Sequence, residues 1–72
     1  MYRITADVEY LDGFLAGLCI TGGHSYTVPT QELAVSRVRV LSELERTGDY
    51  LKAAVTGHRY RVSNPRVERV YA

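Results

Sequence analysis

The sequence predicts an α+β protein in which one helix packs on one face of an antiparallel β-sheet. Residues 2–10 alternate between apolar and polar side chains, which is the period-two pattern of a half-buried strand. Residues 30–47 carry an apolar stripe at helical spacing, and turn residues separate the remaining short apolar runs. Strands joined by tight turns pair antiparallel, so we expect two layers in the order β-β-(β)-α-β-β-β.

A hairpin is expected at the start of the chain. Asp12-Gly13 lies between two apolar runs, and Asp-Gly favours a type I′ turn because both central residues of that turn need positive φ. The returning strand is predicted over residues 14–20. Because this segment is apolar on both faces, we expect one face to meet a partner. Residues 21–25 are expected to form a loop, and residues 26–28 a short third strand.

The helix is expected to begin after Thr30, an N-cap residue, and to end near Thr47, with Gly48 at the C′ position. Arg37 falls in the middle of the predicted stripe. Two interpretations stay open: the helix is rotated so that Arg37 lies at the rim with its stem over the core, or Arg37 points at an acidic ligand or another subunit. The predicted stripe consists of Leu33, Ala34, Val38, Val40, Leu41 and Leu44.

The last third of the chain is predicted to return to strands. These are expected over residues 50–55, 59–62 and 67–71. Ser63-Asn64-Pro65 is predicted to be a turn between the last two, since all three residues favour turns.

Length and composition indicate a single globular domain spanning residues 1–72. The chain is 46% hydrophobic with a net charge of +1, which does not fit a disordered tail. No stretch is apolar enough for a membrane span, and the N-terminus lacks the apolar region of a signal peptide. The one cysteine, Cys19, lies in a predicted apolar strand and favours a reducing cytoplasm. A chain this small has little core, so we expect a homo-oligomer.

Two segments are candidate binding sites. In the first, Gly22 and Gly23 would let backbone N–H groups approach an anion, with His24 and Tyr26 as polar or stacking partners. The alternative is an ordinary glycine-containing loop.

The second segment is His58-Arg59-Tyr60-Arg61. Arg59 and Arg61 share one face of the predicted strand and would bind phosphate or carboxylate, while Tyr60 would stack on a base. The alternative is a solvated outer sheet face. Residues 52–72 hold five basic residues and one acidic residue, so the basic charge gathers in this part of the chain.

Catalysis has little support, because the two histidines have no third orienting group and Cys19 lies in an apolar strand, where a thiol behaves as a small hydrophobe and not as a nucleophile. We therefore expect a non-enzymatic protein without cofactor or metal. Two segments, Tyr10–Leu18 and Ala53–Val62, resemble short uncharacterised proteins of phages and their bacterial hosts. That resemblance implies no activity, but it makes sequestration of a nucleotide signal or anti-defence activity more plausible.

These observations lead to one main functional expectation and two alternatives. We expect a small anionic ligand, such as a nucleotide, bound at a homo-oligomer interface through the two candidate segments and Arg37. The first alternative is an interaction module or inhibitor that docks on a host protein through residues 14–20 and the helix. The second is single-stranded nucleic-acid binding, which the modest net charge does not favour.

Overall fold

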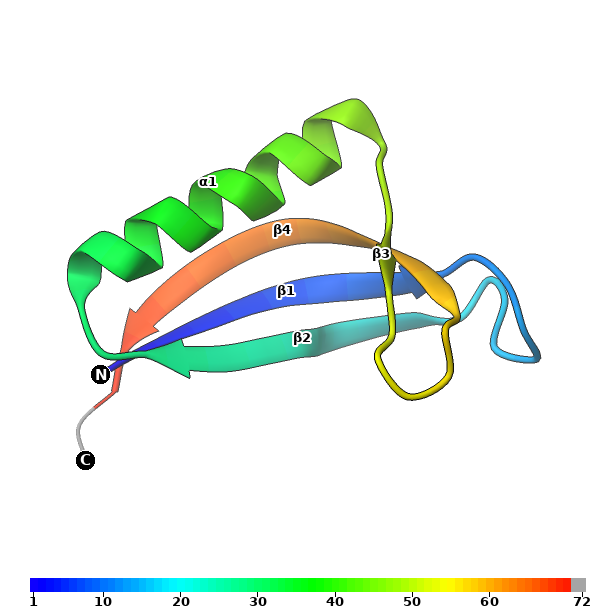
Figure 1. Ribbon diagram of the computed structural model, residues 1–72, viewed down its shortest axis with the longest axis horizontal. Helices are drawn as coiled ribbons and strands as arrows, with labels where there is room; N and C mark the ends of the chain where they lie inside the picture. The colour runs from blue at the N-terminus through cyan, green and yellow to red at the C-terminus, as the bar shows by residue number, and fades with distance from the viewer. Residues whose placement is uncertain (71–72) are drawn as a thin grey trace.

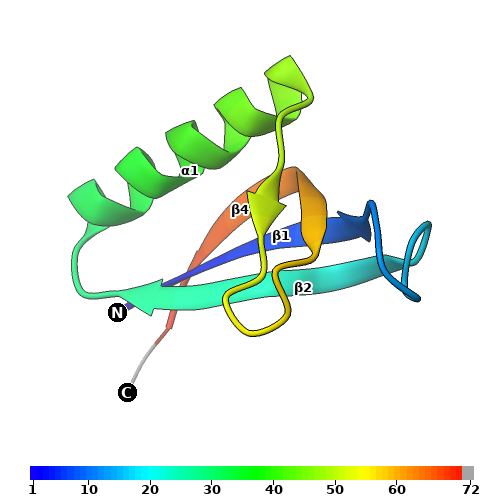
Figure 2. The same cartoon turned by 45° about the vertical axis from the view of Figure 1, so that its right-hand side comes forward.

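The computed structural model describes residues 1–70 and confirms the α+β class. One helix lies on the concave face of a curled four-stranded antiparallel sheet (Figures 1 and 2). The order of the strands in the sheet is β2-β1-β4-β3. The elements are β1 (Tyr2–Tyr10), β2 (Cys19–Val28), α1 (Gln31–Thr47), β3 (Leu51–Lys52) and β4 (Arg59–Arg69).

The hairpin between β1 and β2 is longer than predicted. Residues 11–18 form a loop, so the expected strand over 14–20 is wrong except for its last two residues. Gly13 does have positive φ, at 76°. The two-residue turn does not form, because the Asp12 carboxylate instead accepts hydrogen bonds from the backbone N–H and the Nε of Arg59, at 2.9 and 2.8 Å. This contact draws the loop toward the start of β4.

The segment predicted as a loop over 21–25 is part of β2, and the expected strand over 26–28 is the end of that same strand. Gly22 adopts a φ of 71° inside it, and the pairing with β1 shifts register between Ala6 and Val8. The glycines therefore form a bulge within a continuous strand, because glycine tolerates the left-handed conformation that the bulge needs. Cys19, expected inside an apolar strand, is the first residue of β2 and is exposed.

The predicted turn at Ser63-Asn64-Pro65 is also a bulge. β4 runs unbroken through it, so the two strands expected over 59–62 and 67–71 are one strand; Tyr71 lies outside the described residues. Asn64 adopts a φ of 51°, and the pairing with β1 shifts register between Thr5 and Asp7. Proline is tolerated there because a bulge removes the need for its N–H in the ladder. The strand expected over 50–55 is reduced to β3.

The helix boundaries are confirmed. The Thr30 side chain accepts a hydrogen bond from the Leu33 N–H at 3.2 Å. At the other end Gly48 has a φ of 71°, and the Asp49 N–H donates to the Leu44 carbonyl at 3.1 Å. Both caps satisfy backbone groups that a helix end would otherwise leave unpaired.

The helix is rotated relative to the predicted stripe. Ala34 and Leu41 are buried, whereas Leu33 and Val40 are 43% and 52% exposed. The buried direction therefore lies to one side of the predicted centre, which places Arg37 at the rim with an exposed side chain. The helix is thus rotated as the first interpretation of Arg37 assumes, and the exposed guanidinium at the rim is open to a ligand, as the second assumes.

The core is small. The buried cluster, which the helix closes from the concave side, consists of Ile4, Ala6, Val28, Ala34, Leu41 and Val62. Partly buried residues from both layers surround it, among them Val38 and Leu44 of α1. The helix packs mostly on β4 and β1 and least on β2, so the concave side of β2 is left partly open.

Shortening one core side chain should therefore be costly. Leu41→Ala is expected to lower the free energy of unfolding by about 2–5 kcal/mol, because it leaves a cavity in a core with few other contacts. Val40→Ala on the exposed side of the same helix should change it by no more than about 0.5 kcal/mol. Urea denaturation measures both values, and similar losses in the two variants would contradict the observed helix orientation.

Candidate functional site

The open part of the concave face is lined by an aromatic cluster, which we define as Tyr10, His24, Tyr26 and Tyr60. The rings come from three strands: Tyr10 from β1, His24 and Tyr26 from β2, and Tyr60 from β4. His24 meets Tyr26 edge-on with ring centroids 5.5 Å apart, and lies 6.1 Å from Tyr60. Tyr60 in turn lies 6.0 Å from Tyr10. All four side chains are half-buried, so the cluster presents ring surface to solvent.

The ionisation of His24 is tied to this environment. Burial lowers the pKa of His24 below its ordinary value of 6.5, because the charged ring loses hydration. The ring is therefore neutral at pH 7, and its Nδ1 can accept a hydrogen bond from the Tyr60 hydroxyl, 3.4 Å away. Burial also raises the pKa of both Tyr26 and Tyr60. His24, Tyr26 and Tyr60 are thus uncharged at neutral pH.

Arg37 brings positive charge to the rim of the cluster. It projects from α1 close enough to Tyr26 for its charge to lower the pKa of the tyrosine, against the larger effect of burial. Among residues 1–70, four other arginines form ion pairs with the chain's own carboxylates; they are Arg3, Arg46, Arg59 and Arg66. Arg37 forms no ion pair within these residues and remains available to an anion.

Of the residues predicted from the first segment, His24 and Tyr26 belong to this site and the two glycines do not. The Gly22 N–H donates to the Asp7 carboxylate at 3.0 Å. Arg66 donates to the same Asp7 oxygen at 3.1 Å. The backbone position expected to receive an external anion therefore holds a carboxylate of the chain itself. A Cβ on Gly23 would lie 3.2 Å from side-chain atoms of Ile20 and Val8, so this glycine allows close packing.

The second predicted segment is divided in the same way, since only Tyr60 contributes to the cluster. Arg59 pairs with Asp12 at 2.8 Å and lies over the Tyr50 ring, 5.3 Å from its centroid. Arg61 donates to the Gly48 carbonyl at 3.2 Å. His58 packs so closely on Gly13 that a Cβ there would lie 2.6 Å from its ring. These three side chains hold loops and helix ends together.

Sequence reasoning missed two residues that matter here, Tyr10 and Asp7. The signal for Tyr10 was present, because it shares the apolar face of residues 2–10. Nothing in the local sequence indicates the role of Asp7, since its partners are 15 and 59 residues away along the chain.

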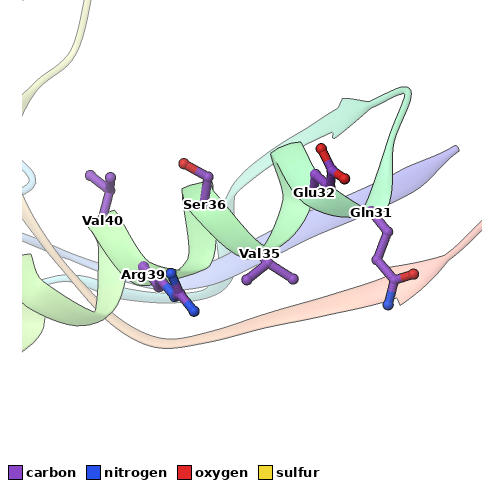
Figure 3. Close-up of a pocket in the computed structure, with 6 residues that line it drawn as sticks. All are labelled: Gln31, Glu32, Val35, Ser36, Arg39 and Val40. Atoms are coloured by element: carbon purple, nitrogen blue, oxygen red, sulfur yellow. The ribbon is translucent and has the colours of Figure 1, made fainter.

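The exposed side of α1 offers a second, weaker candidate. A shallow hollow there is lined by residues of this helix alone: Gln31, Glu32, Val35, Ser36, Arg39 and Val40 (Figure 3). Their side chains fan out to both sides of the helix and do not converge on a common point (Figure 3). A surface of this kind suits contact with another macromolecule better than enclosure of a small ligand.

Within residues 1–70 no cluster of histidine, cysteine, aspartate or glutamate has the composition of a metal site. The described helix is too short and too polar to cross a membrane. Comparison of the chain with protein-family models, with curated proteins and with solved structures gives no match.

The Asp7 contact should make the stability of the fold depend on pH in the acid range. The hydrogen bond from the Gly22 N–H, and then the hydrogen bond and charge of Arg66, lower the pKa of Asp7 below its usual 3.8. Its contribution to stability is thus present above pH 3.8 and is lost as the pH falls through the lower pKa of the folded state.

Asp7→Asn should lower the melting temperature at pH 7 and flatten its fall below about pH 4. Glu9→Gln removes a carboxylate from the same face of β1 without removing a contact to either bulge, and should keep the wild-type profile. Thermal unfolding followed by circular dichroism from neutral to acid pH makes the comparison. An unchanged profile for Asp7→Asn would show that the bulges do not need this carboxylate.

Proposed function

We propose that this protein binds a small anionic ligand carrying a planar ring, on the open part of its concave face. Arg37 carries the proposal: it is a cation without an intramolecular ion-pair partner among the described residues, placed beside a half-buried aromatic cluster. The reaction class is binding without chemistry, since the cluster has no nucleophile and no carboxylate to orient His24.

The ligand chemistry follows from the two parts of the site. Half-buried tyrosine rings offer flat apolar surface on which a base or another aromatic ring stacks. A guanidinium at the rim matches a phosphate or carboxylate group, to which it donates two parallel hydrogen bonds. A nucleotide combines both features, with the base over the cluster and the phosphate toward Arg37.

Removal of the rim charge tests this arrangement. Arg37→Gln should weaken binding of adenosine 5′-monophosphate by about tenfold to a hundredfold, because a charge-assisted hydrogen bond is lost. Arg39→Gln is the matched control, since it removes the same charge from the same helix on the exposed side away from the cluster. Titration followed by ¹H–¹⁵N correlation spectra gives the affinities and locates the affected amides.

Two reduced ligands separate the contributions. Adenosine lacks the phosphate and inorganic phosphate lacks the ring, so each should bind more weakly than the nucleotide. The affected amides should belong to β2 and α1 around His24, Tyr26 and Arg37. If a panel of nucleoside monophosphates with different bases shifts none of these amides, the proposed function is wrong.

Docking on a protein partner is the second candidate, and one observation favours it. Phe14 is 90% exposed in the loop between β1 and β2, although the base of that loop is held by the Asp12–Arg59 ion pair. An exposed phenylalanine on a loop with a fixed base resembles the anchor residues of protein interfaces. Binding of single-stranded nucleic acid is less favoured, because the charges of Arg59 and Arg66 are already neutralised by Asp12 and Asp7.

If docking is the function, a complex recovered from host lysate should survive high salt and should be lost with Phe14→Ser. Val55→Ser is the matched control, since Val55 is 97% exposed on the other loop at this end. Both variants should keep the wild-type melting temperature to within a few degrees, because neither side chain packs in the core. A complex that forms equally well with Phe14→Ser would exclude this loop as the anchor.

A further inference from the structure

The two edges of the sheet are protected to very different degrees. On the β4 side, β3 covers only the first residues of β4. The remaining edge carries Pro65 and the bulge at Asn64, whose N–H donates to the Glu45 carboxylate of α1 at 3.0 Å. Arg61 reaches from the same strand to the end of the helix. Proline, charge, a bulge and a covering helix are the means by which proteins prevent sheet edges from pairing.

The β2 edge lacks most of these features. β2 is ten residues long and contains no proline, lysine, arginine, aspartate or glutamate. Its bulge occupies residues 21–23, so His24–Val28 pair regularly with β1. On the convex face this regular part carries the small, exposed side chains of Ser25 and Thr27. The strand therefore presents a neutral row of backbone donors and acceptors to solvent.

The absence of charge points to a particular partner. Where a strand pairs antiparallel with a second copy of itself across a two-fold axis, the residue on the axis meets its own copy, and every other residue meets the one equally far beyond the axis. A charge on the axis, or charges of one sign on both sides of it, would place like charges opposite each other, which destabilises cross-strand pairs. A strand that pairs with a different chain has no such constraint, and complementary charges would then be expected. A strand with no charge over its whole length satisfies the condition for self-pairing.

We infer that two copies of this protein pair through their β2 edges, antiparallel and two-fold symmetric, to form one continuous eight-stranded sheet. The axis lies near Tyr26, the middle of the regular segment 24–28, so that Ser25 faces the partner's Thr27. The contact is made by backbone groups and by convex-face side chains. On the concave face Tyr26 meets the partner's Tyr26 across the axis, but the backbone pairing itself needs no ligand to form.

Charge substitutions at the axis provide the test. Ser25→Lys with Thr27→Lys places four like charges together in the dimer and should weaken self-association by at least about tenfold. Ser36→Lys with Ser42→Lys adds the same charge to exposed positions of α1 and should leave association unchanged. Sedimentation equilibrium over a concentration series up to the millimolar range gives the dissociation constants.

A complementary pair of variants makes the outcome independent of any loss of folding. Ser25→Glu with Thr27→Glu should also be monomeric, whereas a mixture of the glutamate and lysine variants should form a heterodimer. Restored association supports pairing at this edge, because a misfolded chain would not be rescued by its opposite charge. The inference is overturned if the wild type stays monomeric at millimolar concentration, or if the lysine variant associates as tightly as the helix control.

Discussion

The Asp7 carboxylate is the contact on which the shape of the molecule depends. It lies on the central strand β1, between a bulge in β2 on one side and a bulge in β4 on the other. One of its oxygens accepts hydrogen bonds from both bulged strands, through the Gly22 N–H and Arg66. Bulges bend and twist the strands that carry them, so two bulges at the same level curl the sheet. The curl gives α1 a concave face on which to pack (Figure 2). Two alanines, Ala6 and Ala34, lie fully buried in the core.

Most of the arginines also contact groups of the chain itself. A chain with nearly balanced charge could leave its arginines free for ligands, but most of these side chains stabilise the fold. Asp12 and Arg59 fix one loop, Asp7 and Arg66 hold the bulges, and Arg61 reaches the end of the helix. These contacts remove from the binding surface much of the basic charge that gathers in the last third of the sequence. Arg37 differs because the rotation of the helix leaves it at the rim, outside the range of a carboxylate partner in the described part of the chain.

The elements that could be predicted from sequence are those whose signals are local. The helix is an example, since the Thr30 cap and the Gly48 stop lie within a few residues of the groups they satisfy. The ends of the strands after β1 could not be predicted correctly, because Gly22 and Ser63-Asn64-Pro65 are residue types that occur in turns as well as in bulges. Whether such a segment forms a turn or a bulge depends on its pairing with the neighbouring strand. A bulge of one residue also shifts the alternation, so that Val62 and Val67 both share a face with β1 apolar residues although their spacing is odd.

The candidate site could be predicted only in part. His24, Tyr26 and Tyr60 lie together on the concave face, and Arg37 lies beside Tyr26. Gly22, Arg59 and Arg61 do not join them, since each meets a group from elsewhere in the chain that no local pattern reveals. The sequence indicated that the donor groups of these three residues would bind an anion. Whether a donor remains free for a ligand depends on whether the fold brings a carboxylate or a carbonyl of the chain within reach.

The geometry of β2 lets its edge and its concave face serve separate purposes. Successive side chains of a strand point to opposite faces, while the backbone groups of its free edge point along the sheet. Ser25 and Thr27 therefore face away from His24 and Tyr26, and pairing along the edge leaves the His24 ring accessible while Tyr26 meets its counterpart across the axis. Two copies joined at β2 would bring their aromatic clusters to adjacent positions on one continuous concave surface. Each Arg37 would then stand at the outer rim of a wider site, in which a ligand on one protomer lies close to the axis of the dimer.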